Sequence, residues 1–283
     1  MSSATLAAAT SGTVRFRLAG GAQPLILVPV RVNDHGPFEF ILDTGAGTSL
    51  LAPELANSLA VKSIGSKQGH TAGGAVDVLL ANVDSIALGD VRRENIDVGI
   101  TDLSMIGRAV GAQLDGDLGY NFLKHFRLSL DFHALELRVH DPCRVEQFGP
   151  PRGTELSMRL AHPSKPLILI ETFVSDRGPF QFAIDTGTST TAISPELARA
   201  LHLQPFPFGA ATTGGAQIQL TAAQVSSLRV GRAELRDVHV VIGEFLAMLS
   251  TVAGAKLDGI VGYNFLRNYK VVIDYPNESF RLE

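Results

Sequence analysis

The sequence carries the stretch Ile41-Leu42-Asp43-Thr44-Gly45, and a matching stretch, Ala183-Ile184-Asp185-Thr186-Gly187, follows 142 residues later (185 − 43). In both copies apolar residues lead directly into Asp-Thr-Gly, which predicts a buried strand that ends in a turn. One copy alone is weak information, because aspartate and glycine are common turn residues. Two copies at equivalent positions predict a pair of carboxylates supplied by two related halves.

The repeat extends over most of the chain, and its spacing changes by one residue at most. The matching segments are 24–28 with 166–170, 36–40 with 178–182, 53–56 with 195–198, and 119–123 with 262–266. Two copies of this length can each hold a core, so the sequence predicts a duplicated domain and not a solenoid. We expect one lobe at residues 14–141 and the other at 154–283, because prolines and glycines interrupt the pattern between them.

Within each half the pattern is mostly that of strands. Residues 14–18 alternate between apolar and polar, and turn residues such as Asn33-Asp34-His35-Gly36 separate the strands. The predicted fold class is all-β, with two homologous closed β-barrel lobes related by a pseudo-two-fold axis. Two short helices are expected in each half, each second helix being followed by a hairpin. These helices begin near Pro53 and Asn121 and near Pro195 and Asn264.

Two aspartates at a two-fold axis repel each other, so only one ionises easily near neutrality and the pair shares a proton. The ionised member can take a proton from a water molecule while the protonated member hydrogen-bonds a substrate carbonyl. Thr44 and Thr186 are suited to hydrogen bonds across the axis that hold both loops. Gly45 and Gly187 allow backbone amides to approach the carboxylates without an intervening side chain.

These features resemble the aspartic proteases of the pepsin and retropepsin superfamily, with both lobes in one chain. The resemblance covers most of residues 14–283. It includes a later motif of two apolar residues and a glycine before a short helix. The second half has Ile260-Val261-Gly262 at this place. The first half has Asp117-Leu118-Gly119, in which Asp117 departs from the motif because it is acidic. It implies an aspartic endopeptidase with Asp43 and Asp185 as the catalytic pair. Water would be the nucleophile and an extended polypeptide the substrate, with neither metal nor cofactor.

Members of this superfamily also close β-hairpin flaps over the bound peptide. By position, Gly73 and Gly74 in the first half and Gly214 and Gly215 in the second are the expected flap tips. Ordinary glycine hairpins are the alternative interpretation. Two glycine tips favour a fused retropepsin-like dimer over a true pepsin.

The two halves differ at two positions near the expected site. Thr188 follows the second Asp-Thr-Gly, whereas Ala46 follows the first, and the Thr188 hydroxyl favours the charged form of Asp185. Asp117 stands where the second half has Ile260, which in the family lines the cleft. Asp117 is either an exposed loop carboxylate or a third acid near the pair. As a third acid it would attract a basic substrate side chain and raise the apparent pKa of the pair.

Composition excludes several other classes of protein. Of 283 residues, 45% are hydrophobic, which is enough for a sizeable core. A formal net charge of −4 provides no basic field for nucleic acid. Cys143 is the only cysteine, so an internal disulfide is impossible, and the eight histidines form no metal-binding motif. No apolar run is long enough to span a bilayer.

We therefore expect a soluble monomer whose partner is a polypeptide substrate, located in the cytoplasm or in the periplasm or outside the cell. The alternative function, from a different class, is a peptide-binding module that kept the fold and lost useful turnover. The two intact Asp-Thr-Gly triads favour the enzyme.

Overall fold

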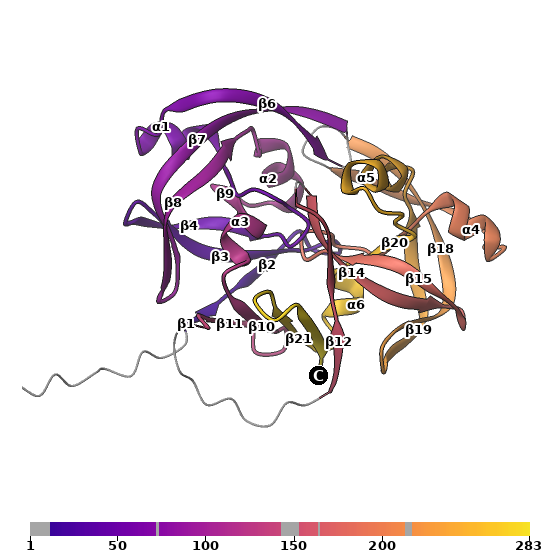
Figure 1. Cartoon of the computed structure of the whole chain (residues 1–283). Helices are drawn as coiled ribbons and strands as arrows, with labels where there is room; N and C mark the ends of the chain where they lie inside the picture. The colour runs from indigo at the N-terminus through magenta and orange to yellow at the C-terminus, as the bar shows by residue number, and fades with distance from the viewer. Residues whose placement is uncertain (1–11, 72–73, 143–152, 164, 213–216) are drawn as a thin grey trace, which may run out of the picture.

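The computed structural model of the chain describes residues 12–71, 74–142, 153–163, 165–212 and 217–283. The fold is mostly β, with two repeated sheet-rich lobes that stand on a third sheet (Figure 1). Cys143 lies outside the described residues. In the part of the chain that is described, no helix has the length and apolar character needed to cross a membrane.

The N-terminal lobe contains an eight-stranded sheet. Its strands, in order across the sheet, are β2 (Arg17–Ala19), β3 (Leu25–Val32), β4 (His35–Leu42), β9 (Gly116–Leu118), β5 (Leu50–Leu51), β8 (Val91–Ile100), β7 (Gly74–Leu88) and β6 (Ser63–Thr71). A further pairing joins β3 to β7. The short strand β9 lies between β4, to which it runs parallel, and β5, to which it runs antiparallel.

The C-terminal lobe repeats this order strand for strand. The strands are β13 (Arg159–His162), β14 (Lys165–Val174), β15 (Arg177–Ile184), β20 (Gly259–Val261), β16 (Ala192–Ile193), β19 (Ala233–Ile242), β18 (Gln217–Val230) and β17 (Phe206–Thr212). The further pairing is repeated as well, between β14 and β18. The duplication read from the sequence is therefore a duplication of the whole sheet.

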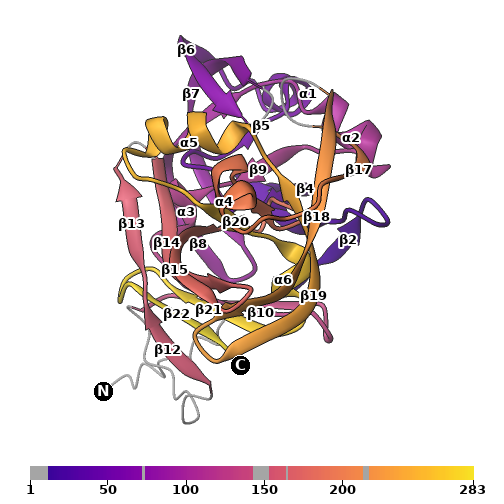
Figure 2. The same ribbon diagram turned by 90° about the vertical axis from the view of Figure 1, so that its right-hand side faces the viewer.

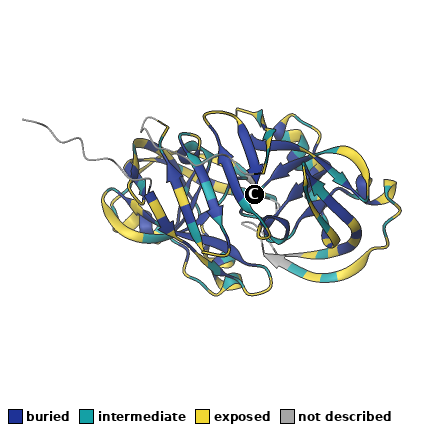
Figure 3. Ribbon diagram, turned by 90° about the horizontal axis from the view of Figure 1, so that it is seen from below, coloured by how far each residue is buried: buried dark blue, intermediate teal, exposed yellow. Residues whose placement is uncertain are grey.

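Local sequence explains how the chain reaches the interior in each lobe. Asn33 and Asp34 have φ values of 50° and 64°, as required in the two-residue turn between β3 and β4. Ser175 and Asp176 repeat this turn with φ values of 50° and 61°. Strand β4 begins with exposed residues and ends with three buried ones, so it runs from the surface into the core. Figure 3 shows exposed positions concentrated at the periphery of both lobes.

A third sheet joins the two lobes below the eight-stranded sheets (Figure 2). Its strands, in order, are β1 (Gly12–Arg15), β11 (Glu136–His140), β10 (Arg127–Asp131), β21 (Lys270–Asp274), β22 (Ser279–Leu282) and β12 (Thr154–Ser157). Strand β10 pairs antiparallel with β21, so the two hairpins predicted from the sequence are parts of one sheet. Leu128 and Leu130 from one half and Val271 and Ile273 from the other are fully buried there.

The helices differ in part from the expectation. Helices α1 (Pro53–Ser58) and α4 (Pro195–Ala200) begin at the predicted prolines. Helices α3 (Tyr120–Leu123) and α6 (Tyr263–Leu266) begin one residue before the expected asparagines and are short.

The expectation of two helices in each half is wrong, because each lobe has a third. These are α2 (Ser104–Val110) and α5 (Phe245–Ala253). Each ends at a glycine with left-handed backbone, Gly111 with φ 67° and Gly254 with φ 58°. In the sequence, these two glycines were the signal for the ends of the two helices. The predicted alternating segment 14–18 is also interrupted at Phe16, so that β1 and β2 belong to different sheets.

Leu130→Ala tests whether the third sheet makes one folding unit of the two lobes. Leu130 is 0% exposed on β10, and its loss should lower the free energy of unfolding by about 2–5 kcal/mol. Both lobes should still unfold in one transition, because the sheet is shared. Chemical denaturation followed by circular dichroism measures both quantities.

Leu79→Ala is the matched control, since Leu79 is 46% exposed and its loss should change stability by no more than about 0.5 kcal/mol. Two separate transitions in Leu130→Ala would contradict the shared unit.

Candidate active site

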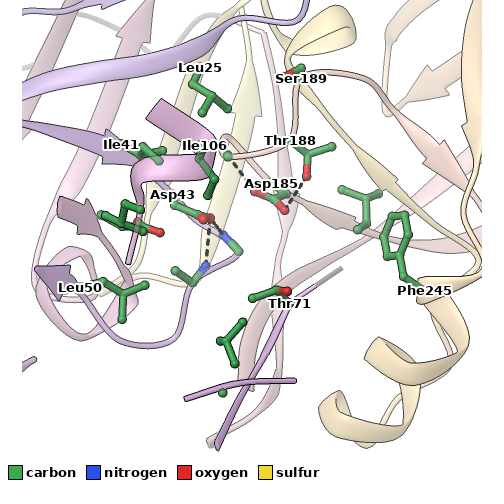
Figure 4. Close-up of a pocket in the computed structure, with 18 of the residues that line it drawn as sticks. Leu25, Ile41, Asp43, Leu50, Thr71, Ile106, Asp185, Thr188, Ser189 and Phe245 are labelled. Atoms are coloured by element: carbon green, nitrogen blue, oxygen red, sulfur yellow. Dashed lines mark hydrogen bonds between the residues drawn. The ribbon is translucent and has the colours of Figure 1, made fainter. Parts of the chain in front are cut away.

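Asp43 and Asp185 directly follow β4 and β15, whose last three residues are buried. Both aspartates are half-buried and line one cavity of about 750 Å³, to which both lobes contribute. Figure 4 shows the two carboxylates next to each other in the middle of this cavity. The structure thus brings together the two residues that the sequence predicts as a pair.

Four hydrogen bonds between the lobes hold the two aspartate loops against each other. The Thr44 hydroxyl donates to the Ile184 carbonyl and accepts from the Thr186 amide, both at 3.1 Å. The Thr186 hydroxyl donates to the Leu42 carbonyl at 2.7 Å and accepts from the Thr44 amide at 3.1 Å. Both threonines are 1% exposed, so water competes little for these bonds. The bonds are reciprocal between the lobes, as the sequence predicts for Thr44 and Thr186.

Gly45 and Gly187 allow the two loops to come this close. A Cβ atom at Gly45 would lie 2.6 Å from Asp185 Oδ2, and one at Gly187 would lie 2.6 Å from Asp43 Cγ. Carbon atoms do not approach carboxylates so closely, so a larger residue in either position would displace the opposite aspartate. Glycine is required here by space and not by its backbone angle.

The hydrogen bonds to the two carboxylates differ. Asp43 Oδ1 accepts from the amides of the second and third residues after it, at 2.7 and 3.0 Å. Asp185 Oδ1 accepts from the Gly187 amide at 2.8 Å, and its Oδ2 accepts from the Thr188 hydroxyl, also at 2.8 Å. Each of these donors stabilises a charged carboxylate. The Thr188 hydroxyl has no equivalent at Ala46.

Asparagines behind each aspartate loop fix its shape. Asn121 Oδ1 accepts from both the amide and the hydroxyl of Ser49 at 2.8 Å, and Asn121 Nδ2 donates to the Asp97 carbonyl at 2.6 Å. In the second half, Asn264 Oδ1 likewise accepts from both the amide and the hydroxyl of Thr191 at 2.8 Å. Sequence reasoning placed these asparagines in short helices and missed this role. An asparagine occurs at the matching position of both halves, and this repetition was the sequence signal for a role at the site.

Tyr275 lies within electrostatic range of the aspartate pair. Burial raises the pKa of its hydroxyl, and the nearby negative charge of Asp43 raises it further, so Tyr275 remains a neutral phenol. Its ring packs edge-on against Tyr120, with 5.6 Å between ring centroids. In the matching pair Phe132 packs in the same way against Tyr263, also at 5.6 Å, and each of the two pairs joins one half to the other.

Most of the predicted site residues line the cavity, whereas Thr44 and Thr186 lie buried below it. The predicted residues that line it are Asp43, Gly45, Asp117, Asp185, Gly187, Thr188 and Ile260. Asp117 is 7% exposed and lies on strand β9, which rules out the alternative of an exposed loop carboxylate. Among the described residues, no group of three or more His, Cys, Asp or Glu could hold a metal ion.

Two β-hairpins add further residues to the cavity wall. The hairpin of β6 and β7 contributes Lys67, Thr71 and Val76, and the hairpin of β17 and β18 contributes Ala210 and Leu220. Figure 1 shows β6 crossing the top of the N-terminal lobe toward the other lobe. The strands of each hairpin flank one of the glycine segments predicted as flap tips.

Of the four predicted flap-tip glycines, Gly74 begins strand β7 with a φ of 116°. Gly73, Gly214 and Gly215 lie outside the described residues, so their role at the tips stays a prediction.

The helices that the sequence did not predict also face the cavity. Ile106 and Val110 of α2 line it from the N-terminal lobe, and Phe245 and Leu249 of α5 line it from the C-terminal lobe. These side chains give the cavity an apolar wall on each side. Ile106 and Phe245 are labelled in Figure 4.

A model of the aspartyl protease family matches the chain twice, at residues 28–122 and 170–265. Each match contains one Asp-Thr-Gly and one Gly-Tyr-Asn-Phe segment, and together the matches cover more than half of the chain. The chain belongs to the aspartyl protease family. No curated protein gives a match to it. One aspartyl protease domain per lobe confirms the predicted resemblance and supports aspartic peptidase activity.

Thr44→Val tests the contribution of the cross-lobe hydrogen bonds in this aspartyl protease. The substitution leaves the Ile184 carbonyl and the Thr186 amide without their buried partner. Each buried group that loses its hydrogen-bond partner costs about 1–3 kcal/mol. We therefore expect the free energy of unfolding to fall by about 2 kcal/mol or more. Urea denaturation provides the measurement.

Thr44→Ser is the matched control, because it keeps the hydroxyl and removes one methyl group, at a cost of about 1 kcal/mol. Equal losses in the two variants would show that packing, and not hydrogen bonding, holds the loops.

Proposed function

We propose that this protein is an aspartic endopeptidase in which Asp43 and Asp185 together activate a water molecule to attack a peptide bond. The observation that carries the proposal is the set of reciprocal hydrogen bonds of Thr44 and Thr186. These bonds hold two carboxylates from different lobes side by side in a cavity that can admit a ligand. Such an arrangement has little structural benefit, since like charges so close together repel.

In the proposed mechanism the two carboxylates share one proton. Asp185, which accepts the extra hydrogen bond from Thr188, is the ionised member and removes a proton from the water. Asp43 carries the shared proton and donates a hydrogen bond to the carbonyl oxygen of the substrate, which becomes more susceptible to attack. The roles then exchange: Asp185 delivers the proton that it took from the water to the leaving amine, and the amide bond breaks.

We further propose that the substrate is an extended polypeptide lying between the lobes, beneath hairpins that act as flaps. The cavity residues contributed by both hairpins support this placement. The pairings of β3 with β7 and of β14 with β18 support closure of each lobe into a barrel, with a pseudo-two-fold axis between them. Because both aspartates belong to one chain, we expect a monomer to be sufficient for activity.

Asp43→Asn and Asp185→Asn test the proposed pair. Each change keeps the volume of the side chain and removes an ionisable group, so kcat should fall at least about 100-fold. Cleavage of a mixed peptide library between about pH 3 and 7, followed by mass spectrometry, is the measurement. Asp84→Asn, at an exposed position of β7 outside the cavity, is the matched control and should cleave as the unmodified protein does.

Full cleavage by Asp43→Asn would exclude the proposed pair. Tight peptide binding by the unmodified protein without any cleavage would instead favour the peptide-binding module.

Thr188→Ala tests whether Asp185 is the ionised member. The substitution removes the hydroxyl that donates to Asp185 and makes the second loop resemble the first, which has Ala46. The charged carboxylate then loses a donor, so protonation persists to higher pH. The acidic limb of the profile of kcat/KM against pH should therefore move to higher pH, because the lost bond favours the charged form. An unmoved limb, or one displaced to lower pH, would contradict the assignment.

A further inference from the structure

The two lobes present different walls to the same cavity. Apart from Asp43, the wall of the N-terminal lobe includes three ionisable side chains, Lys67, Asp102 and Asp117. Apart from Asp185, the wall of the C-terminal lobe consists, among the described residues, of apolar, glycine and hydroxyl-bearing residues. A substrate that crosses the cavity therefore meets an acidic surface on one side and an uncharged one on the other.

One difference between the walls is at Asp117, which corresponds to Ile260 in the internal repeat. Asp117 lies on β9 between Ile41 and Leu50 of the neighbouring strands, and it is 7% exposed. Ile260 occupies the same place on β20 and is 3% exposed. A carboxylate at this depth attracts a cationic side chain strongly, because little water is present to screen the charge.

Asp102 adds a second negative charge on the same side. It is exposed and lies two residues before α2. Its Oδ1 accepts a hydrogen bond of 2.7 Å from the Ser104 amide, which holds the pKa of Asp102 below its usual range. Lys67 is the cation of this wall and lies exposed on the β6 hairpin, whereas Asp117 is buried in the wall itself.

The opposite wall suits a large apolar side chain. Phe245 and Leu249 of α5 face the cavity together with Leu167 and Leu220. These residues belong to one apolar cluster that also contains Ile260. Figure 4 shows Phe245 on this side of Asp185 and across the cavity from Leu50.

We propose that the cavity selects polypeptides with a lysine or arginine on one side of the scissile bond and a large apolar residue on the other, in one order only. The order is determined by Asp117, because the C-terminal lobe has no acid at the matching position. The inference rests on the proposed peptidase function and adds to it the class and the direction of the substrate.

The test uses three peptides that differ only at the two central residues, Lys-Phe, Phe-Lys and norleucine-Phe. The unmodified protein should cleave one of the lysine orders about 30-fold faster than the other in kcat/KM, since pairing of a buried charge contributes about 2 kcal/mol or more. Asp117→Ile, which copies the other lobe, should bring the ratio of the two orders close to one. Asp117→Asn should do the same, because the charge of Asp117, and not its volume, sets the order.

The double variant Asp117→Ile/Ile260→Asp exchanges the two residues between the lobes, and it should prefer the opposite order. The norleucine peptide reports whether each variant remains active. Glu171→Gln, at an exposed position outside the cavity, controls for loss of a negative charge and should keep the original order. Equal cleavage of both orders by the unmodified protein, or a preference that survives Asp117→Ile, would overturn the inference and leave the peptidase function intact.

Peptides of both orders with a non-cleavable hydroxyethylene group at the centre separate the two proposals, since their Kd values can be measured by calorimetry without turnover. Absence of cleavage, together with an order preference in Kd that Asp117→Ile removes, would overturn the peptidase function and support the selectivity. Neither cleavage nor binding of any peptide would overturn both.

Discussion

Two buried threonine hydroxyls, each hydrogen-bonded to the backbone of the opposite lobe, hold the two halves of the site together. They place Asp43 and Asp185 close enough that only glycine fits beside each carboxylate. Two like charges so near each other are unfavourable. The buried bonds, together with the amide donors to each carboxylate, offset that repulsion and hold the site in one arrangement.

The architecture around the threonines resists separation of the lobes. Strands β10 and β21 pair below the site, so the two halves share a sheet as well as a set of hydrogen bonds. Behind the loops, Asn121 and Asn264 connect each aspartate turn to the rest of its own lobe. The cavity above is lined by hairpins and helices from both lobes.

Joining both lobes in one chain allows the halves to differ where a dimer of identical chains could not. Thr188 faces Asp185 while Ala46 follows Asp43, and Asp117 in one wall corresponds to Ile260 in the other. Each difference changes charge or hydrogen bonding at a point that touches the cavity. The asymmetry gives the two carboxylates different surroundings and the cavity two different walls.

Four features could be predicted from the amino-acid sequence: the duplication, the aspartate pair, the helix starts at Pro53 and Pro195, and the hairpin turns. These features depend on local preferences and on spacing that repeats along the chain. Three features became visible in the folded chain: the last hairpin of each half joins a common sheet, α2 and α5 line the cavity, and Asp117 is buried in its wall. Strand pairing and burial arise from contacts between segments far apart in the chain, such as β10 with β21, and a local sequence pattern does not encode such contacts.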